Sequence, residues 1–301
     1  MAADLGIVIV NWNTRDLLRR CLESVYASEG VTFRVVVVDN ASDDGSAQMV
    51  RTTFPQAAVI ESEINGGYPY ANNLGLRVLG FGRKNGEEAP RYALLLNPDT
   101  VLPPDALREM VAFMDADPRI GIAGPKLVLP DGRMDLACRR SFPSPEISFY
   151  RMTGLSKLFP RSRRFGRYNM TYLDPDQVTE VDSVVGAYMQ VRREAIADVG
   201  LLDESFFMYG EDLDWAYRVK MAGWTVWYNP AVTVLHIKRA ASRKSRRAQF
   251  EFYRAMLIFY RKHYRRQTPL WLHSLILLGL ILRGGPRLWQ EIRRPTLLRA
   301  P

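Results

Sequence analysis

The chain has 301 residues, of which 47% are hydrophobic and 24% charged, a composition typical of a folded globular protein and not of a disordered one. Only Cys21 and Cys138 are present. Two cysteines are too few for a disulfide framework, so we expect a reducing compartment. The first residues lack the basic stretch, apolar core and small-residue cleavage site of a secretory leader. The sequence therefore predicts a cytosolic protein.

The net charge of +9 is unevenly distributed along the chain. Residues 238–266 contain eleven Lys or Arg against Glu251 alone, whereas residues 1–237 carry a net charge of −5. This division predicts a mildly acidic catalytic domain at 1–240 and a basic C-terminal region at 241–301.

Apolar runs alternate with helical spacing in the first hundred residues. The expected strands are 5–10, 34–38, 58–60 and 92–96, and the expected helices are 16–26, 47–54 and 70–80. This alternation predicts an α/β fold with a doubly wound, Rossmann-like sheet. In such sheets, ligands bind beyond the carboxyl ends of the strands.

Polar clusters follow each of these strands, at 11–14, 39–44, 65–67 and 97–100. Neither a dinucleotide glycine fingerprint nor a phosphate-binding P-loop follows the first strand, which disfavours NAD binding and P-loop phosphoryl transfer. A nucleotide could still bind, with Asp39 accepting the imino N–H of a pyrimidine and Asn73 or nearby backbone contacting ribose or phosphate.

The acidic stretch at 209–215 concentrates Glu211, Asp212 and Asp214 in four positions. Like charges this close are costly unless a cation, a proton or a reaction uses them. Asp99, at the tip of a buried strand, could hold a divalent cation in the same cleft. Taken singly, these acids also fit structural roles, because acids in a first helical turn stabilise the helix dipole and Asp99 could cap a turn.

Five motifs, taken in order and spacing, resemble family 2 glycosyltransferases, and most closely the bacterial rhamnosyltransferase-type branch. The resemblance covers residues 5–240, and the motifs lie at 8–13, 38–46, 65–75, 96–100 and 209–214. It implies a GT-A fold, a nucleoside-diphosphate sugar donor, a divalent cation and inversion at the anomeric carbon. It also implies a donor half at about 1–100 and an acceptor half at about 101–240.

The resemblance assigns donor-side roles residue by residue. Asp39 matches the carboxylate that binds the base, and Asp99 matches an acid that binds the metal. Asn97 stands where the family's first metal-binding acid would be, a departure that lowers the expected metal affinity. The other expected donor-pocket residues are Asn11, Asn13, Asn65 and Asn73.

On the acceptor side, Asp212 matches the general base and Glu211 its acidic neighbour. His236 matches an imidazole that completes the metal shell, although taken alone it could be a structural histidine. A neutral imidazole is a better ligand for manganese than for magnesium, so Mn²⁺ is expected to activate better than Mg²⁺. The remaining acceptor-side candidates are Gly186, Ala187, Asp214 and Trp215.

Three further segments carry structural expectations of their own. Residues 121–129 predict a strand followed by a tight turn. Residues 141–176 have no clean period and predict either a mobile loop or lid near the acceptor or a surface insertion without function. At the C-terminal end, 250–264 predicts a basic amphipathic helix.

The apolar run at 270–282 has thirteen residues, fewer than the ~20 needed to cross a bilayer. It could lie on an anionic membrane surface or pack on the catalytic domain. Nucleic acid is not expected to bind the basic tail, because no zinc finger, helix-turn-helix or RNA-binding motif accompanies it.

The sequence thus predicts an inverting glycosyltransferase of cell-envelope glycan synthesis, peripheral at the inner face of the membrane. It would move a sugar such as rhamnose from a dTDP or UDP donor to a lipid-linked or polysaccharide acceptor. One alternative is a sugar-phosphate nucleotidyltransferase, which should carry a basic glycine-rich loop after its first strand. Another is a non-catalytic sugar-binding protein on the same fold.

Overall fold

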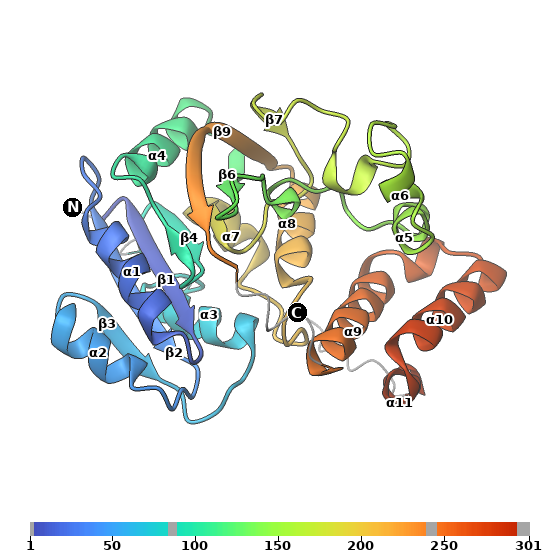
Figure 1. Ribbon diagram of the computed structural model, residues 1–301, viewed down its shortest axis with the longest axis horizontal. Helices are drawn as coiled ribbons and strands as arrows, with labels where there is room; N and C mark the ends of the chain where they lie inside the picture. The colour runs from blue at the N-terminus through green and yellow to red at the C-terminus, as the bar shows by residue number, and fades with distance from the viewer. Residues whose placement is uncertain (1–2, 84–88, 239–245, 294–301) are drawn as a thin grey trace.

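The computed structural model describes residues 3–83, 89–238 and 246–293. Within these residues, nine strands form one mixed sheet in the order β3-β2-β1-β4-β8-β6-β9-β5, with β7 paired to β9 (Figure 1). The strands are β1 (Leu5–Asn11), β2 (Phe33–Asp39), β3 (Ala58–Glu61), β4 (Tyr92–Leu96), β5 (Thr100–Val101), β6 (Ile120–Val128), β7 (Thr179–Glu180), β8 (Tyr188–Arg192) and β9 (Thr225–His236).

Helices cover the sheet and extend beyond it on the C-terminal side of the molecule (Figure 1). Helix α3 packs on β1 and β2, and α8 packs on β6 and β9. The helices are α1 (Arg15–Tyr26), α2 (Ser46–Thr53), α3 (Tyr68–Val78), α4 (Ala106–Ala116), α5 (Pro145–Met152), α6 (Leu155–Leu158), α7 (Arg193–Val199), α8 (Glu211–Met221), α9 (Arg246–His263), α10 (Leu270–Gly284) and α11 (Pro286–Arg293).

The α/β alternation expected in the first hundred residues is confirmed. All four expected strands and all three expected helices are present, with ends shifted by no more than two residues. Strands β1 to β4 form parallel pairs. Because β1 and β4 are completely buried, both of their faces must be apolar, which explains their continuous Val, Ile and Leu runs.

The second half of the sheet departs from simple alternation. Strand β8 runs antiparallel to β4 and to β6, and β9 runs parallel to β6. Strand β5 pairs antiparallel with β9, which places Thr100 opposite His236. This pairing joins the segment after β4 to a strand more than a hundred residues later.

The expectation of a loop at 141–176 is wrong in part, because α5, α6 and a short 3₁₀ turn (Arg167–Asn169) occupy it. Helix α5 begins with an N-cap: Ser144 Oγ accepts a hydrogen bond from the Ile147 N–H (3.3 Å), and Pro145 is the first helical residue. Such a short helix depends on its cap more than on apolar periodicity. Periodicity therefore gave no signal for it.

Helices α9 and α10 confirm that 250–264 and 270–282 are helical. Helix α9 packs on the start of α8, where Leu213 and Phe259 share a small apolar cluster. Leu280 of α10 is buried against Leu257 of α9. No helix in the described part of the chain is both long and apolar enough to span a bilayer. The basic residues 239–245 lie outside the described residues.

Candidate active site

The ends of β1 and β2 bring the first donor-side residues together. Asn11 lies opposite Asp39 in the parallel register, and its Nδ2 donates to Asp39 Oδ2 (3.1 Å) and to Ser42 Oγ (3.1 Å). The Ser42 N–H donates to Asp39 Oδ1 (2.8 Å). Asn13 adjoins them through its N–H, which donates to Ser42 Oγ (3.0 Å). These bonds hold the Asp39 carboxylate in one orientation at the edge of the sheet.

Asn65 lies in the next loop and is held by Asn40, a residue that the sequence analysis missed. Asn40 Nδ2 donates to Asn65 Oδ1 (3.0 Å), and Asn40 Oδ1 accepts from the Gly66 N–H (3.2 Å). Gly67 has a φ of 90°, and a Cβ there would lie 2.3 Å from the Phe207 carbonyl oxygen. Only glycine fits this close approach.

Asn73 does not join the donor-side cluster. Its Nδ2 donates to the Leu202 carbonyl (2.9 Å) and to Glu204 Oε1 (2.8 Å), while its Oδ1 accepts from the Leu202 N–H (3.1 Å). Both ends of this buried amide therefore brace α3 against the loop before α8. The structure gives Asn73 a supporting role where the sequence analysis expected a donor contact.

Asp99 and His236 meet where β5 pairs with β9. Asp99 Oδ1 lies 3.4 Å from His236 Nε2, and the other ring nitrogen, Nδ1, lies 3.0 Å from Asp135 Oδ2. Lys238 Nζ also donates to Asp135 Oδ2 (2.6 Å). Neither Asp135 nor Lys238 was a sequence candidate. Asp135 fixes the ring through a contact that spans 101 residues of sequence.

The electrostatics of this group favour the charged forms of Asp135 and His236. Burial opposes ionisation of Asp135, but hydrogen bonds from His236 and Lys238 outweigh it and hold the pKa of Asp135 well below its usual value. Burial likewise lowers the pKa of His236, and the hydrogen bonds with Asp135 and Asp99 outweigh it and raise that pKa. A raised pKa means that protons compete with any metal for the ring at acidic pH.

The group fits a divalent cation only in part. The described residues contain no cluster of three His, Cys, Asp or Glu side chains that could hold a metal. Asp99 and His236 nevertheless present a carboxylate oxygen and a ring nitrogen to one point, and Asp135 orients the ring from behind. A cation bound to a nucleotide is commonly held by one or two protein ligands, and phosphate oxygens of the nucleotide complete its coordination shell.

Asn97 carries the link from this group to the rest of the site. Its N–H donates to the Ala187 carbonyl (3.0 Å), and its own carbonyl accepts from Thr100 Oγ1 (2.8 Å). The neighbouring Gly186 N–H donates to Asp212 Oδ2 (3.0 Å). The Gly186 and Ala187 backbone therefore joins the end of β4 to the acidic stretch.

Asp212 is held by a buried ion pair at the start of α8. Arg140 Nη2 donates to Asp212 Oδ2 (2.7 Å), and both side chains are 8% exposed. Asp212 Oδ1 accepts from the Leu213 N–H (2.8 Å). The chain enters α8 through two residues with left-handed backbone, Tyr209 (φ 68°) and Gly210 (φ 82°). Such strain in a bulky residue concentrates at functional sites.

Glu211 differs from its neighbour because no cation among the described residues forms an ion pair with it. Its Oε2 is buried without a hydrogen-bond partner among the described residues. Burial and the nearby charge of Asp212 raise the pKa of Glu211 to about 8. Adjacent carboxylates thus separate into an ion-paired one and a neutral one.

Tyr68 shows that the two acidic sites lie close together. Its hydroxyl donates to the Gly186 carbonyl (2.8 Å). Burial, with the charges of Glu211, Asp212 and Asp99, raises the pKa of this phenol well above its ordinary value. All three carboxylates therefore act on one side chain.

Asp214 and Trp215 lie in the interior, away from the acceptor side where they were expected. Trp215 is completely buried, and its Nε1 donates to the Gly200 carbonyl (2.9 Å). Asp214 is also completely buried and accepts hydrogen bonds from Arg218 (2.9 Å) and His263 (2.8 Å). Burial opposes ionisation, but these partners lower the pKa of Asp214 to about 2. Asp214 fastens α9 to α8.

Comparison with known proteins decides the family. The family model described as "Glycosyltransferase like family 2" matches residues 2–254. The chain belongs to this family. It is a glycosyltransferase, and the family confirms the resemblance drawn from the five motifs.

Individual relatives agree with the family. The chain is 29% identical over 236 residues to N-acetylglucosaminyl-diphospho-decaprenol L-rhamnosyltransferase of Mycobacterium tuberculosis, covering 78% of this chain and 76% of that one.

Two solved structures share the fold. The mannosyltransferase PcManGT from Pyrobaculum calidifontis, in complex with GDP-Man and Mn²⁺, superposes with a TM-score of 0.60 at 17% identity, over 98% of this chain and 77% of that one. GalNAc-T7 with UDP, GalNAc and Mn²⁺ gives 0.61 at 15% identity, over 86% of this chain. This chain spans about half of that protein, 48%. The likeness identifies the fold of this family member as GT-A.

The position of Asp135 behind His236 generates a prediction. Asp135→Asn removes the charge that holds Nδ1–H, so the ring loses its fixed tautomer. We expect manganese affinity, measured with a nucleoside diphosphate present by the electron paramagnetic resonance of free Mn²⁺, to fall about 10- to 100-fold. Asp131→Asn, in the exposed turn four residues earlier, is the matched control and should leave affinity unchanged. Unchanged affinity in Asp135→Asn would show that the ring needs no such partner.

The raised pKa of Glu211 makes a second prediction. Between pH 4.5 and about 8, the unfolded chain ionises this carboxyl while the folded protein keeps it protonated. Stability is therefore lost as the pH rises through this window. Glu211→Gln removes this pH-dependent loss, because glutamine does not ionise. The difference in melting temperature, variant minus unchanged protein, should therefore increase by several degrees between pH 4.5 and about pH 8.

Glu63→Gln, at an exposed position, is the control and should give a difference independent of pH. A flat profile for Glu211→Gln as well would mean that Glu211 is ionised in the folded protein.

Proposed function

We propose that the protein is an inverting glycosyltransferase in which Asp212 is the general base. The donor is a nucleoside-diphosphate sugar, with dTDP or UDP as the nucleotide and rhamnose as the expected sugar, and the acceptor is lipid-linked. The observation that carries the proposal is the backbone of Gly186 and Ala187, which joins Asp212 to the segment after β4 that carries Asn97 and Asp99. A proton acceptor and a donor site thus share one rigid connection.

The contrast between the two neighbouring acids favours Asp212 as the base. Its ion pair with Arg140 keeps a carboxylate at this position, whereas Glu211, with a pKa of about 8, is protonated at neutral pH. A protonated carboxyl cannot remove a proton from an acceptor hydroxyl. In single-displacement chemistry, that hydroxyl oxygen forms the new bond to the anomeric carbon as the bond to the leaving diphosphate breaks. Asp212 takes the hydroxyl proton.

The donor-side residues support nucleotide binding at the strand ends. Asp39, fixed by Asn11 and Ser42, would accept the imino N–H of a pyrimidine base. Asp99 and His236 would hold a divalent cation, with Mn²⁺ favoured by the imidazole. When bound, the cation neutralises charge on the leaving diphosphate. The solved mannosyltransferase with GDP-Man and Mn²⁺ has the same fold and supports this assignment.

A lipid-linked acceptor is supported by the name of the mycobacterial relative, whose substrate is a diphospho-decaprenol. It is also supported by the surface of α10. Trp271, Leu275, Leu278 and Leu282 follow one another at helical spacing and are 52–76% exposed. Such an apolar stripe, with the exposed Arg283 next to Leu282, suits peripheral binding to an anionic membrane. The expected setting is cell-envelope glycan synthesis at the inner face of the membrane.

Turnover of Asp212→Asn tests the proposed base. Transfer should fall about 10²- to 10⁴-fold, because the amide cannot accept the proton, while nucleoside-diphosphate affinity is retained. Circular dichroism must confirm folding, since the variant breaks a buried ion pair. Asp198→Asn, at an exposed site on α7, should keep full turnover. The proposal is wrong if Asp212→Asn stays active in transfer and Glu211→Gln does not.

Vesicle sedimentation tests the membrane surface. Leu275→Glu with Leu278→Glu places two charges in the exposed stripe, and partitioning onto vesicles containing phosphatidylglycerol should fall by at least about tenfold. Val78→Glu, on a similarly exposed apolar residue of α3, should bind like the unchanged protein. Equal binding by both variants would place the membrane contact elsewhere.

A further inference from the structure

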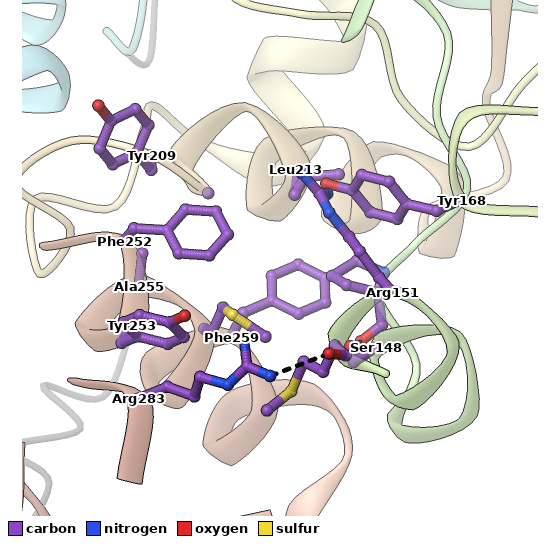
Figure 2. A pocket seen from close by; sticks show the side chains of 14 residues that line it. Ser148, Arg151, Tyr168, Tyr209, Leu213, Phe252, Tyr253, Ala255, Phe259 and Arg283 are labelled. Atoms are coloured by element: carbon purple, nitrogen blue, oxygen red, sulfur yellow. Dashed lines mark hydrogen bonds between the residues drawn. The ribbon is translucent and has the colours of Figure 1, made fainter. Parts of the chain in front are cut away.

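A cavity of about 240 Å³ opens beside the acidic stretch (Figure 2). One wall comes from the start of α8, another from α5 and the segment after it, and the third from α9 and α10. The cavity lining includes Tyr168, Leu213, Phe252, Met256, Phe259 and two arginines, Arg151 and Arg283. None of the proposed catalytic or donor-binding side chains lines it, so those residues give the cavity no role.

The lining combines an apolar wall with positive charge. Aromatic and aliphatic side chains dominate, no Asp or Glu contributes, and Arg151 and Arg283 are both exposed at the rim. Arg151 lies over the Tyr168 ring, 4.2 Å from its centroid, and Arg283 Nη2 donates to the Met152 carbonyl (3.1 Å). Neither guanidinium forms an ion pair with a carboxylate of the described residues. Two uncompensated cations above an apolar wall select a ligand that is both anionic and apolar.

The cavity is lined both by residues next to the acidic carboxylates and by a residue next to the exposed stripe. Gly210 and Leu213, which line it, flank Glu211 and Asp212 in sequence. Helix α10 contributes Arg283 to the cavity lining, and the residue before it, Leu282, belongs to the exposed apolar stripe. A ligand whose tail lies in a membrane could therefore reach the acidic stretch along α10.

We propose that this cavity binds the lipid-phosphate end of the acceptor. The ligand class is a long-chain isoprenoid or alkyl phosphate or diphosphate: Arg151 and Arg283 bind the phosphate oxygens, and the first carbons of the chain contact Phe252, Met256 and Phe259. The volume lies below that of whole-ligand pockets, as expected for a site that holds one segment of a longer molecule. The inference rests on the proposed function for the reaction but assigns a subsite of its own.

Calorimetric titration with farnesyl phosphate, farnesol and inorganic pyrophosphate, each alone, tests the site on the full chain. The unchanged protein should bind farnesyl phosphate at least about tenfold more tightly than farnesol, because charged hydrogen bonds add to apolar contact. Arg151→Gln with Arg283→Gln should remove that advantage. Arg161→Gln with Arg287→Gln changes two exposed arginines that do not line the cavity, and should keep it.

A second variant tests the apolar part. Met256→Trp fills the cavity from α9 and should weaken farnesyl phosphate and farnesol alike. The proposal is overturned if both arginine pairs lower affinity equally, which would indicate bulk charge, or if pyrophosphate binds as tightly as farnesyl phosphate, which would indicate a phosphate site without a lipid. Absence of farnesyl phosphate binding also overturns it.

Donor binding in the unchanged protein separates this inference from the proposed function. Suppose that the protein binds a nucleoside diphosphate and that its affinity for farnesyl phosphate does not depend on Arg151 and Arg283. The proposed function would then stand, and the lipid-phosphate subsite would be rejected. If farnesyl phosphate binding depends on the two arginines but the protein transfers no sugar from any nucleotide sugar, the subsite would stand and the proposed function would be rejected. In active protein, the double arginine variant should raise KM for a lipid-diphosphate acceptor more than it lowers kcat.

Discussion

The buried ion pair between Arg140 and Asp212 is the interaction on which the site depends. Removing two charges from water costs several kcal/mol per ion, so such a pair persists only when further hydrogen bonds complete it. Here the Gly186 N–H completes the carboxylate, and the Val184 carbonyl accepts from the same guanidinium nitrogen (2.6 Å). The pair thereby fixes α8 against the segment before β8. Glu211 lies beside this pair, and its own burial together with the charge of Asp212 keeps that carboxyl protonated at neutral pH.

A second polar group holds the donor side in the same way. The His236 ring lies between the carboxylates of Asp99 and Asp135. The pairing of β5 with β9 places Thr100 opposite His236 and so brings Asp99 next to the ring. The Ala187 carbonyl connects this group to Arg140 and Asp212 through Asn97 and the adjacent Gly186. Asp212, Asp99 and His236 are thus linked through backbone hydrogen bonds at the edge of the sheet.

Sequence patterns predicted what local physics controls. Strands β1 and β2 are buried runs of Val and Ile, and the rule that ligands bind at parallel strand ends placed Asn11 beside Asp39. The sequence analysis did not identify Arg140 and Asp135. Arg140 contacts Asp212 across 72 residues of sequence and Asp135 contacts His236 across 101, and no local periodicity encodes contacts at such separations.

The acidic stretch shows the same limit within one helix. Asp214 and Trp215 were read with Asp212 as one motif, but α8 is buried on more than one side. Only packing decides which acid faces the site and which meets α9. The short helix α5 was missed because a cap and a proline specify it, without apolar periodicity.

The most direct test of the account is the melting temperature with dTDP, UDP and GDP, each with Mn²⁺, with Mg²⁺ and with chelator. A nucleotide at a hundredfold excess over its Kd stabilises the folded protein by about 2.7 kcal/mol. The account predicts a rise for a pyrimidine diphosphate that needs the cation, is largest with Mn²⁺, is lost in Asp99→Ala and is kept in Asp212→Asn. A protein that no nucleoside diphosphate stabilises, or in which Asp99→Ala keeps the metal-dependent rise, would contradict it.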